Sequence, residues 1–170
     1  KISDTITSDG LKMLPATVEG YIEALLDCYI IYKADRYDIK GRKILKTLNK
    51  YYLVDMGIRK FLLGNKGEDQ GHILENIVYL DLLRRGYRVY IGKVRYNNKD
   101  LEIDFVAETP EGTEYYQVAD TVKGEETLTR ELTALKGIKD NYPKFILTRD
   151  YGNIDHSGVK QINVLEWLLK

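Results

Sequence analysis

The sequence predicts an α/β protein in which helices flank a mixed β-sheet. From about residue 66 onward, segments with helical spacing of apolar residues and segments with strand-like alternation follow in the order helix, three strands, helix, strand. Among 170 residues, 44% are hydrophobic and 31% are charged, which is enough apolar material for a buried core. A shorter segment, residues 1–65, precedes this sheet and has a different pattern.

Residues 1–65 are predicted to form a helix followed by a β-hairpin. The helix starts near Thr17, which can cap its first turn, and Val18, Ile22 and Leu26 share its apolar face. The hairpin is expected to have strands at residues 29–32 and 51–54 and a turn near residues 40–42. This arrangement resembles the second half of a winged-helix module, with the hairpin as the wing.

A polar, glycine-rich joint at residues 64–71 separates this segment from the predicted sheet domain, residues 66–170. Gly86 is expected to end the first helix of that domain, and hairpin turns are expected at residues 97–99 and 110–112. The predicted elements are helices at 72–85, from 125, and at 164–169, and strands at 87–91, 101–107, 115–120, 145–147 and 159–163.

Composition excludes several classes of protein. The 26 basic and 26 acidic residues balance, so net charge gives no argument for a nucleic acid or a membrane. Cys28 is the single cysteine, which rules out an internal disulfide and favours the cytosol; it is expected to be buried. No apolar run reaches the length of a membrane span, and the first residue, Lys1, suggests a fragment of a longer chain.

Basic residues gather in the predicted hairpin, where a wing could contact phosphates. The helix before it carries Glu19, Glu23 and Asp27, which a DNA groove would repel. A solvated or protein-facing hairpin therefore stays open beside nucleic-acid contact. The candidate nucleic-acid-binding residues are Lys40, Arg42, Lys43 and Lys46.

Acidic and amide side chains point to a possible metal site. Glu102 and Asp104 share one face of a strand whose other face carries Leu101, Ile103, Phe105 and Ala107. Glu75 lies in the middle of an otherwise apolar helix. Glu75, Glu102 and Asp104 could hold Mg²⁺, which prefers carboxylates, water and substrate phosphate, and such an ion would activate water for phosphodiester cleavage.

In order and spacing, Glu75, Asp104 and Gln117 resemble the catalytic motif of the PD-(D/E)XK nuclease superfamily. The resemblance implies a restriction-endonuclease-like sheet and a catalytic role for these three residues. Ala119 stands where that motif has a lysine, which speaks against cleavage. Lys93 or Lys123 could supply a substitute ammonium group.

Five short sequence segments, spread over nearly the whole chain, carry a second resemblance. They are KYYLVDMGIR from Lys50, GHILENIVY from Gly71, RGYRVY from Arg85, EIDFV from Glu102 and YQVA from Tyr116. Together they resemble a C-terminal domain of unknown function that follows an AAA-type ATPase module in bacterial and archaeal proteins. This resemblance implies an ATPase module upstream as the partner within the same chain, and the fragment itself has no phosphate-binding loop for ATP.

We therefore expect a non-catalytic accessory domain of an ATPase that binds nucleic acid, DNA in the first instance, or a partner protein. A Mg²⁺-dependent nuclease and a protein-interaction or oligomerisation module are the alternatives.

Overall fold

The computed structural model describes residues 2–8, 10–64 and 70–170. Within them the elements are α1 (Ile2–Ser8), α2 (Pro15–Asp27), β1 (Ile31–Asp38), β2 (Lys43–Leu53), α3 (Met56–Leu63), α4 (Gln70–Arg84), β3 (Arg88–Tyr96), β4 (Lys99–Thr109), β5 (Gly112–Ala119), α5 (Glu125–Lys136), β6 (Lys144–Thr148), β7 (Ile154–Asp155), β8 (Val159–Asn163) and α6 (Val164–Leu168).

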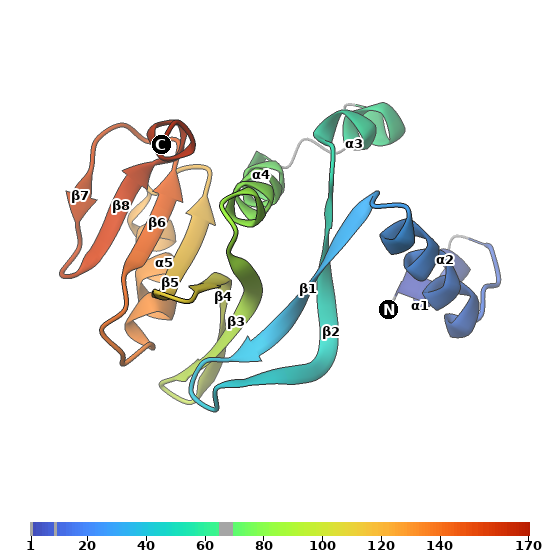
Figure 1. Cartoon of the computed structure of the whole chain (residues 1–170), viewed down its shortest axis with the longest axis horizontal. Helices are drawn as coiled ribbons and strands as arrows, with labels where there is room; N and C mark the ends of the chain where they lie inside the picture. Colours follow the sequence, from blue (N-terminus) through green and yellow to red (C-terminus); the bar gives the residue numbers. More distant parts are fainter. Residues whose placement is uncertain (1, 9, 65–69) are drawn as a thin grey trace.

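All eight of these strands belong to one mixed sheet in the order β2-β1-β3-β4-β5-β6-β8-β7 (Figure 1). The pairs β1–β3, β5–β6 and β6–β8 are parallel, and the other neighbours are antiparallel. The predicted mixed sheet flanked by helices is thus confirmed. Among the described helices, none is long and apolar enough to cross a membrane.

Two hydrophobic clusters cover the opposite faces of the sheet. On one face, Val78 and Leu82 of α4 and Trp167 of α6 pack with Phe105. On the other face, Leu135 of α5 packs with Ile103, Ile146 and their neighbours. Helix α4 meets one face near the middle of the sheet, while α5 covers the other face over the later strands (Figure 1). Each helix contributes one apolar face, as the 3.6-residue spacing predicted.

The first hairpin is longer than its apolar pattern indicated and is part of the main sheet. Strands β1 and β2 extend through the polar middle of the segment, and Arg36 of β1 lies beside Ile91 of β3. The hairpin pairs with β3, so the sheet crosses the predicted boundary near residue 65, and the resemblance to a winged-helix module is not confirmed. Division into two domains stays a prediction.

The predicted end of the helix at Gly86 and the predicted turn at residues 97–99 are both present. Gly86 has a φ of 85°, so it supplies the left-handed backbone that follows α4. Asn97 and Asn98 also have positive φ, as a tight turn between β3 and β4 requires. The expectation for Cys28 was wrong, because this residue follows α2, whose buried set contains only Val18, and it is exposed.

A bulge in β4 changes which face its side chains meet. Tyr90 pairs with Val106 and Gly92 with Ile103, so β4 advances three residues where β3 advances two. Ile103 therefore packs on the α5 face, while Phe105 packs on the α4 face. The predicted single face containing Leu101, Ile103, Phe105 and Ala107 was wrong, because strict alternation does not continue through a bulge.

Gly92 lies opposite this bulge and leaves no room for a side chain. A Cβ atom there would lie 2.8 Å from Cβ of Ile103 and 2.9 Å from Cγ2 of Val106. We expect Gly92→Ala to lower the free energy of unfolding by roughly 1–3 kcal/mol in urea titration, because both neighbours are fully buried. Gly20→Ala is the matched control: its site in α2 is open, and it should be neutral or stabilising. Equal effects would contradict the steric argument.

Candidate functional site

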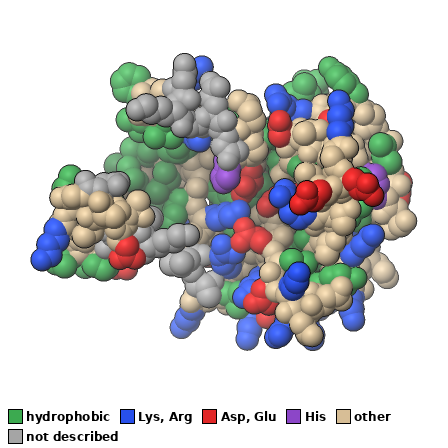
Figure 2. Space-filling model, turned by 180° about the vertical axis from the view of Figure 1, so that it is seen from behind, with side chains coloured by type: hydrophobic (Ala, Val, Ile, Leu, Met, Phe, Trp, Pro, Cys, Tyr) green, Lys and Arg blue, Asp and Glu red, His purple; other side chains and the backbone are tan. Residues whose placement is uncertain are grey.

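A hollow of about 1030 Å³ lies between the start of α4, the first half of β4, the end of β5 and α5. It is lined in part by charged and amide side chains, and Figure 2 shows acidic and basic groups gathered in the centre of this face. The three residues of the predicted catalytic motif, Glu75, Asp104 and Gln117, all line this hollow together with Glu102. Residues that are far apart in the sequence therefore meet here.

The hollow opens where β4 and β5 stop pairing. Their register ends at Phe105 opposite Tyr116, so the next residues have no backbone partner across the two strands. The backbone N–H of Asp104 donates to Oε1 of Gln117 at 2.6 Å, and the N–H of Val118 donates to Oδ2 of Asp104 at 2.8 Å. Two side chains thus replace ladder hydrogen bonds and satisfy backbone groups that would otherwise be costly to bury.

Lys50 of β2 supplies a cation to this cluster. Its Nζ lies 3.1 Å from Oε1 of Glu75 and 2.7 Å from Oε1 of Glu102. Tyr52, two residues further along the same strand, donates its hydroxyl to Oε1 of Glu75 at 2.6 Å. Arg36 of β1 forms an ion pair with the other oxygen of Glu102. The first hairpin therefore provides the positive groups that neutralise the acids of α4 and β4.

Sequence reasoning missed Lys50. It placed the substitute ammonium group at Lys93 or Lys123, but Lys93 is paired with Asp100 at 3.1 Å, and Lys123 is exposed and lies 3.9 Å from Asp150. The signal that could have identified Lys50 is its position directly before the predicted strand 51–54 and two residues before Tyr52, because a strand that begins one residue earlier places both side chains on one face. Which side chains this face contacts depends on the pairing of β1 with β3.

Burial and neighbouring charges shift the pKa values of three residues in this cluster. Burial, reinforced by the negative charge of Glu75, raises the pKa of Asp104 to about 7, although the Val118 N–H and Lys50 oppose the shift. Burial alone would lower the pKa of Lys50, but Glu75 and Glu102 outweigh it and raise that pKa. Burial would raise the pKa of Glu102, but Lys50 and Arg36 lower it. Asp104 can therefore take up a proton near neutral pH.

Gln117 is held as a bridge between the strands and α5. Its Oε1 accepts from Asp104 N, and its Nε2 donates to Oε2 of buried Glu131 at 2.8 Å. The other oxygen of Glu131 accepts from Arg130 Nη2 at 2.7 Å. Each polar atom of the Gln117 side chain thus has a protein partner, which gives this amide a structural role.

The described residues do not form an obvious Mg²⁺ site. Among them there is no group of three or more His, Cys, Asp or Glu side chains that could hold a metal ion. Lys50 stands between Glu75 and Glu102, and the Gln117 oxygen already accepts a backbone N–H. This donor set does not match the oxygen shell that Mg²⁺ requires. The proposed metal ligands Glu75, Glu102 and Asp104 stay a prediction.

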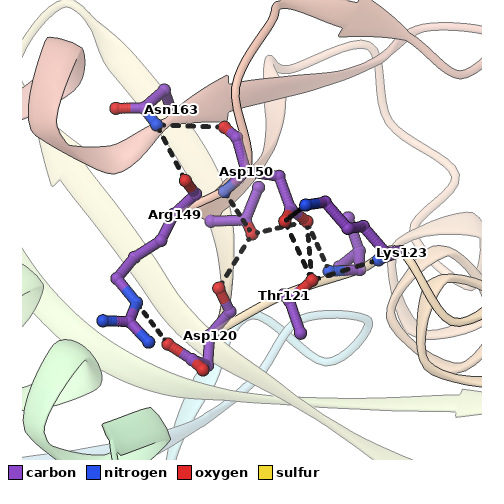
Figure 3. Close-up of polar contacts among 8 residues, drawn as sticks. Asp120, Thr121, Lys123, Arg149, Asp150 and Asn163 are labelled. Atoms are coloured by element: carbon purple, nitrogen blue, oxygen red, sulfur yellow. Dashed lines mark hydrogen bonds and ion pairs between the residues drawn. The ribbon is translucent and has the colours of Figure 1, made fainter.

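Asp150 fixes the rim of the hollow beyond the end of β5 (Figure 3). Its carboxylate accepts from the N–H of Val122 at 2.7 Å and from the hydroxyl of Thr121 at 2.8 Å. Asn163 of β8 donates to the carbonyl oxygens of Arg149 and Asp150. Burial would raise the pKa of the Asp150 carboxyl, but the Val122 N–H and the Thr121 hydroxyl lower it. The network ties the loop before α5 to β6 and β8, so its role is structural.

A second hollow, of about 270 Å³, has basic walls and lies at the tips of the hairpins. We call it the basic groove and define it by Lys40, Arg42, Arg95 and Lys139. Lys40 and Arg42 come from the β1–β2 turn, Arg95 from β3, and Lys139 from the segment after α5. In Figure 2, Lys and Arg side chains gather along the lower edge of the molecule, where the hairpin turns of Figure 1 lie.

The structure separates the four predicted nucleic-acid-binding residues. Lys40 and Arg42 line the basic groove, whereas Lys43 and Lys46 are exposed on β2 outside it. Arg95 and Lys139 were missed because they lie more than 50 residues further along the sequence, and only the fold brings them beside the first hairpin.

The fold and these two hollows define an α/β domain with a mixed sheet, a charged hollow and a basic groove. A family model described as a domain of unknown function, DUF8612, matches residues 5–69. An uncharacterized protein of Haemophilus influenzae is 40% identical over 171 residues, which cover the whole chain and 41% of that protein. An uncharacterized protein of Methanocaldococcus jannaschii is 30% identical over 141 residues, which cover 82% of the chain and 31% of that protein.

These matches show relatives without an assigned activity. The chain spans about two fifths and about a third of the lengths of the two relatives. The expected match to a domain of unknown function is therefore confirmed for residues 5–69, while the upstream ATPase module and the nuclease resemblance belong to the proposal below.

Proposed function

We propose that this chain is a non-catalytic accessory domain of a larger AAA-type ATPase and that it binds nucleic acid through the basic groove. The observation that carries the proposal is the convergence of Lys40, Arg42, Arg95 and Lys139 from three separate segments on one hollow. Four cations and one acid, Asp140, line this groove in a chain without net charge, so the groove has an excess of positive charge, which suits a phosphate backbone. The ATPase part of the proposal rests on the resemblance of the five short sequence segments.

The charged hollow supports the non-catalytic part of the proposal. The lysine of the nuclease-like motif is replaced by Ala119, which packs in the hydrophobic cluster beneath α5. Gln117 is engaged on both polar atoms, and Lys50 neutralises Glu75 and Glu102. These acids and this amide hold the diverging ends of β4 and β5 and anchor the first hairpin, which carries half of the basic groove.

The test is the salt dependence of nucleic-acid binding. Affinity for labelled single-stranded and duplex DNA and RNA would be measured by fluorescence anisotropy at several salt concentrations. We expect the triple variant Lys40→Gln, Arg42→Gln, Arg95→Gln to weaken binding by roughly 100-fold at 0.1 M salt and to reduce the salt slope by about 2–3, because each phosphate contact releases counterions.

A triple variant with the same loss of charge elsewhere is the control. Lys60→Gln, Lys160→Gln and Lys170→Gln remove three exposed cations outside the groove and should change affinity little. Equal losses in both variants would reduce the proposal to general charge attraction. If the chain binds a partner protein and binds no nucleic acid, the interaction-module alternative is favoured. Strand cleavage in Mg²⁺ that disappears in Asp104→Asn would favour the nuclease alternative.

A further inference from the structure

A small hollow of about 210 Å³ adjoins the basic groove and has aromatic walls. Three tyrosines line it, Tyr37 of β1, Tyr115 of β5 and Tyr142 of the segment before β6. It shares the lining residues Ile39, Arg42 and Asp140 with the basic groove, so the two hollows lie side by side. We call it the tyrosine pocket. A positive groove beside aromatic rings combines the two elements that single-stranded nucleic-acid sites use.

Contacts within the pocket hold the rings of Tyr37 and Tyr115 in place. The hydroxyl of Tyr115 donates to Oδ2 of Asp140 at 2.6 Å, and the backbone N–H of Tyr142 donates to Oδ1 at 3.2 Å. Tyr37 stacks on Tyr90 with ring centroids 5.4 Å apart and planes 29° apart. Asp140 thus holds the Tyr115 ring and the backbone of Tyr142, and Tyr90 supports the Tyr37 ring. Rings already held in position lose less conformational entropy when they stack on a ligand.

The polar groups of the two hollows suit different parts of a nucleotide. Glu108 lines the tyrosine pocket and is close enough to Tyr37 to raise its pKa, after burial, the larger cause. A carboxylate accepts hydrogen bonds from the N–H edge of a base and repels phosphate. Arg42, shared by both hollows, and Lys139 in the groove attract phosphate instead, and the shared acid Asp140 is paired with Lys144 at 3.6 Å. This arrangement places a base in the pocket and its phosphate in the groove.

We propose that the basic groove and the tyrosine pocket together bind single-stranded nucleic acid, with one unpaired base stacked against Tyr37 and Tyr142, while Tyr115, which is 3% exposed, forms the floor of the pocket. The inference rests on the proposed nucleic-acid binding and narrows it to a strand whose bases are free. A duplex keeps its bases stacked in the helix, and extruding one costs free energy, so a duplex reaches the groove without filling the pocket.

The experiment separates base recognition from charge. Binding of a ten-nucleotide single strand would be compared with an abasic strand of equal length, with a duplex and with a free nucleoside monophosphate. We expect the single strand to bind about tenfold more tightly than the abasic strand. Tyr142→Ala should abolish this tenfold difference in affinity and leave the affinity for the abasic strand unchanged. Tyr142→Phe should retain the difference because the ring remains.

Tyr142 is 44% exposed, so its substitution should not disturb the core, and Tyr151→Ala is the control because Tyr151 is 89% exposed and lines neither hollow. Equal affinities for the single strand and the abasic strand, or tighter binding of the duplex than of the single strand, would overturn the inference while the proposed function stands. A monophosphate that binds as tightly as the strand would overturn it in favour of a free nucleotide. If none of the strands binds in a salt-dependent manner, the proposed function itself is contradicted.

Discussion

Lys50→Met is expected to lower the free energy of unfolding by about 3 kcal/mol, because it leaves Glu75 without its cation and leaves Glu102 with Arg36 alone. Lys50 contacts both Glu75 and Glu102, and the side chain of Glu75 is only 14% exposed. Uncompensated charge near a buried position is more costly than loss of an exposed ion pair. Chemical denaturation at pH 7.5 would measure the effect.

Lys46→Met provides the matched control, since Lys46 is an exposed lysine on the same strand and should change stability by less than about 0.5 kcal/mol. The double variant Lys50→Met, Glu75→Gln should recover part of the loss, because glutamine still accepts from the Tyr52 hydroxyl but has no charge. Equal destabilisation by Lys46→Met and Lys50→Met, or no recovery in the double variant, would contradict the ion-pair argument.

Asp104→Asn is expected to stabilise the protein at pH 8 by an amount on the order of 2 kcal/mol. The pKa of Asp104 in the folded protein, about 7, lies above the ordinary value of an aspartate. Between about pH 4 and pH 7 the folded state then binds more protons than the unfolded state. Stability of the wild type consequently falls as the pH rises through this window and is level above it.

Asparagine removes this pH dependence and keeps an acceptor for the Val118 N–H. The stability difference between Asp104→Asn and the wild type should therefore be largest at pH 8 and should shrink toward pH 5 in urea titrations. Asp100→Asn is the control on the same strand, because the side chain of Asp100 is 58% exposed and is paired with Lys93. A difference that does not change with pH would show that Asp104 titrates as an ordinary carboxylate.

Local sequence patterns predicted most elements of the fold. Helices α4 and α5 and the three antiparallel strands β3, β4 and β5 follow from apolar spacing, and Gly86 marked the end of α4. The strands predicted for the first hairpin were too short, and β7 was not predicted, because polar strands and two-residue strands carry no apolar alternation. The bulge in β4 was also invisible, since it depends on the register with β3.

The sequence by itself determined the class of fold and brought Glu75, Asp104 and Gln117 into consideration as one group. It could do so because helical and strand periodicity act over a few residues and because the order of the three residues resembled a known motif. Only the tertiary structure decided what surrounds them. Lys50 and Tyr52 reach Glu75 because the parallel pairing of β1 with β3 carries the first hairpin alongside α4 and β4. The basic groove exists for the same reason: the pairing joins the β1–β2 turn to cations far along the chain, and no local pattern encodes contacts between such distant residues.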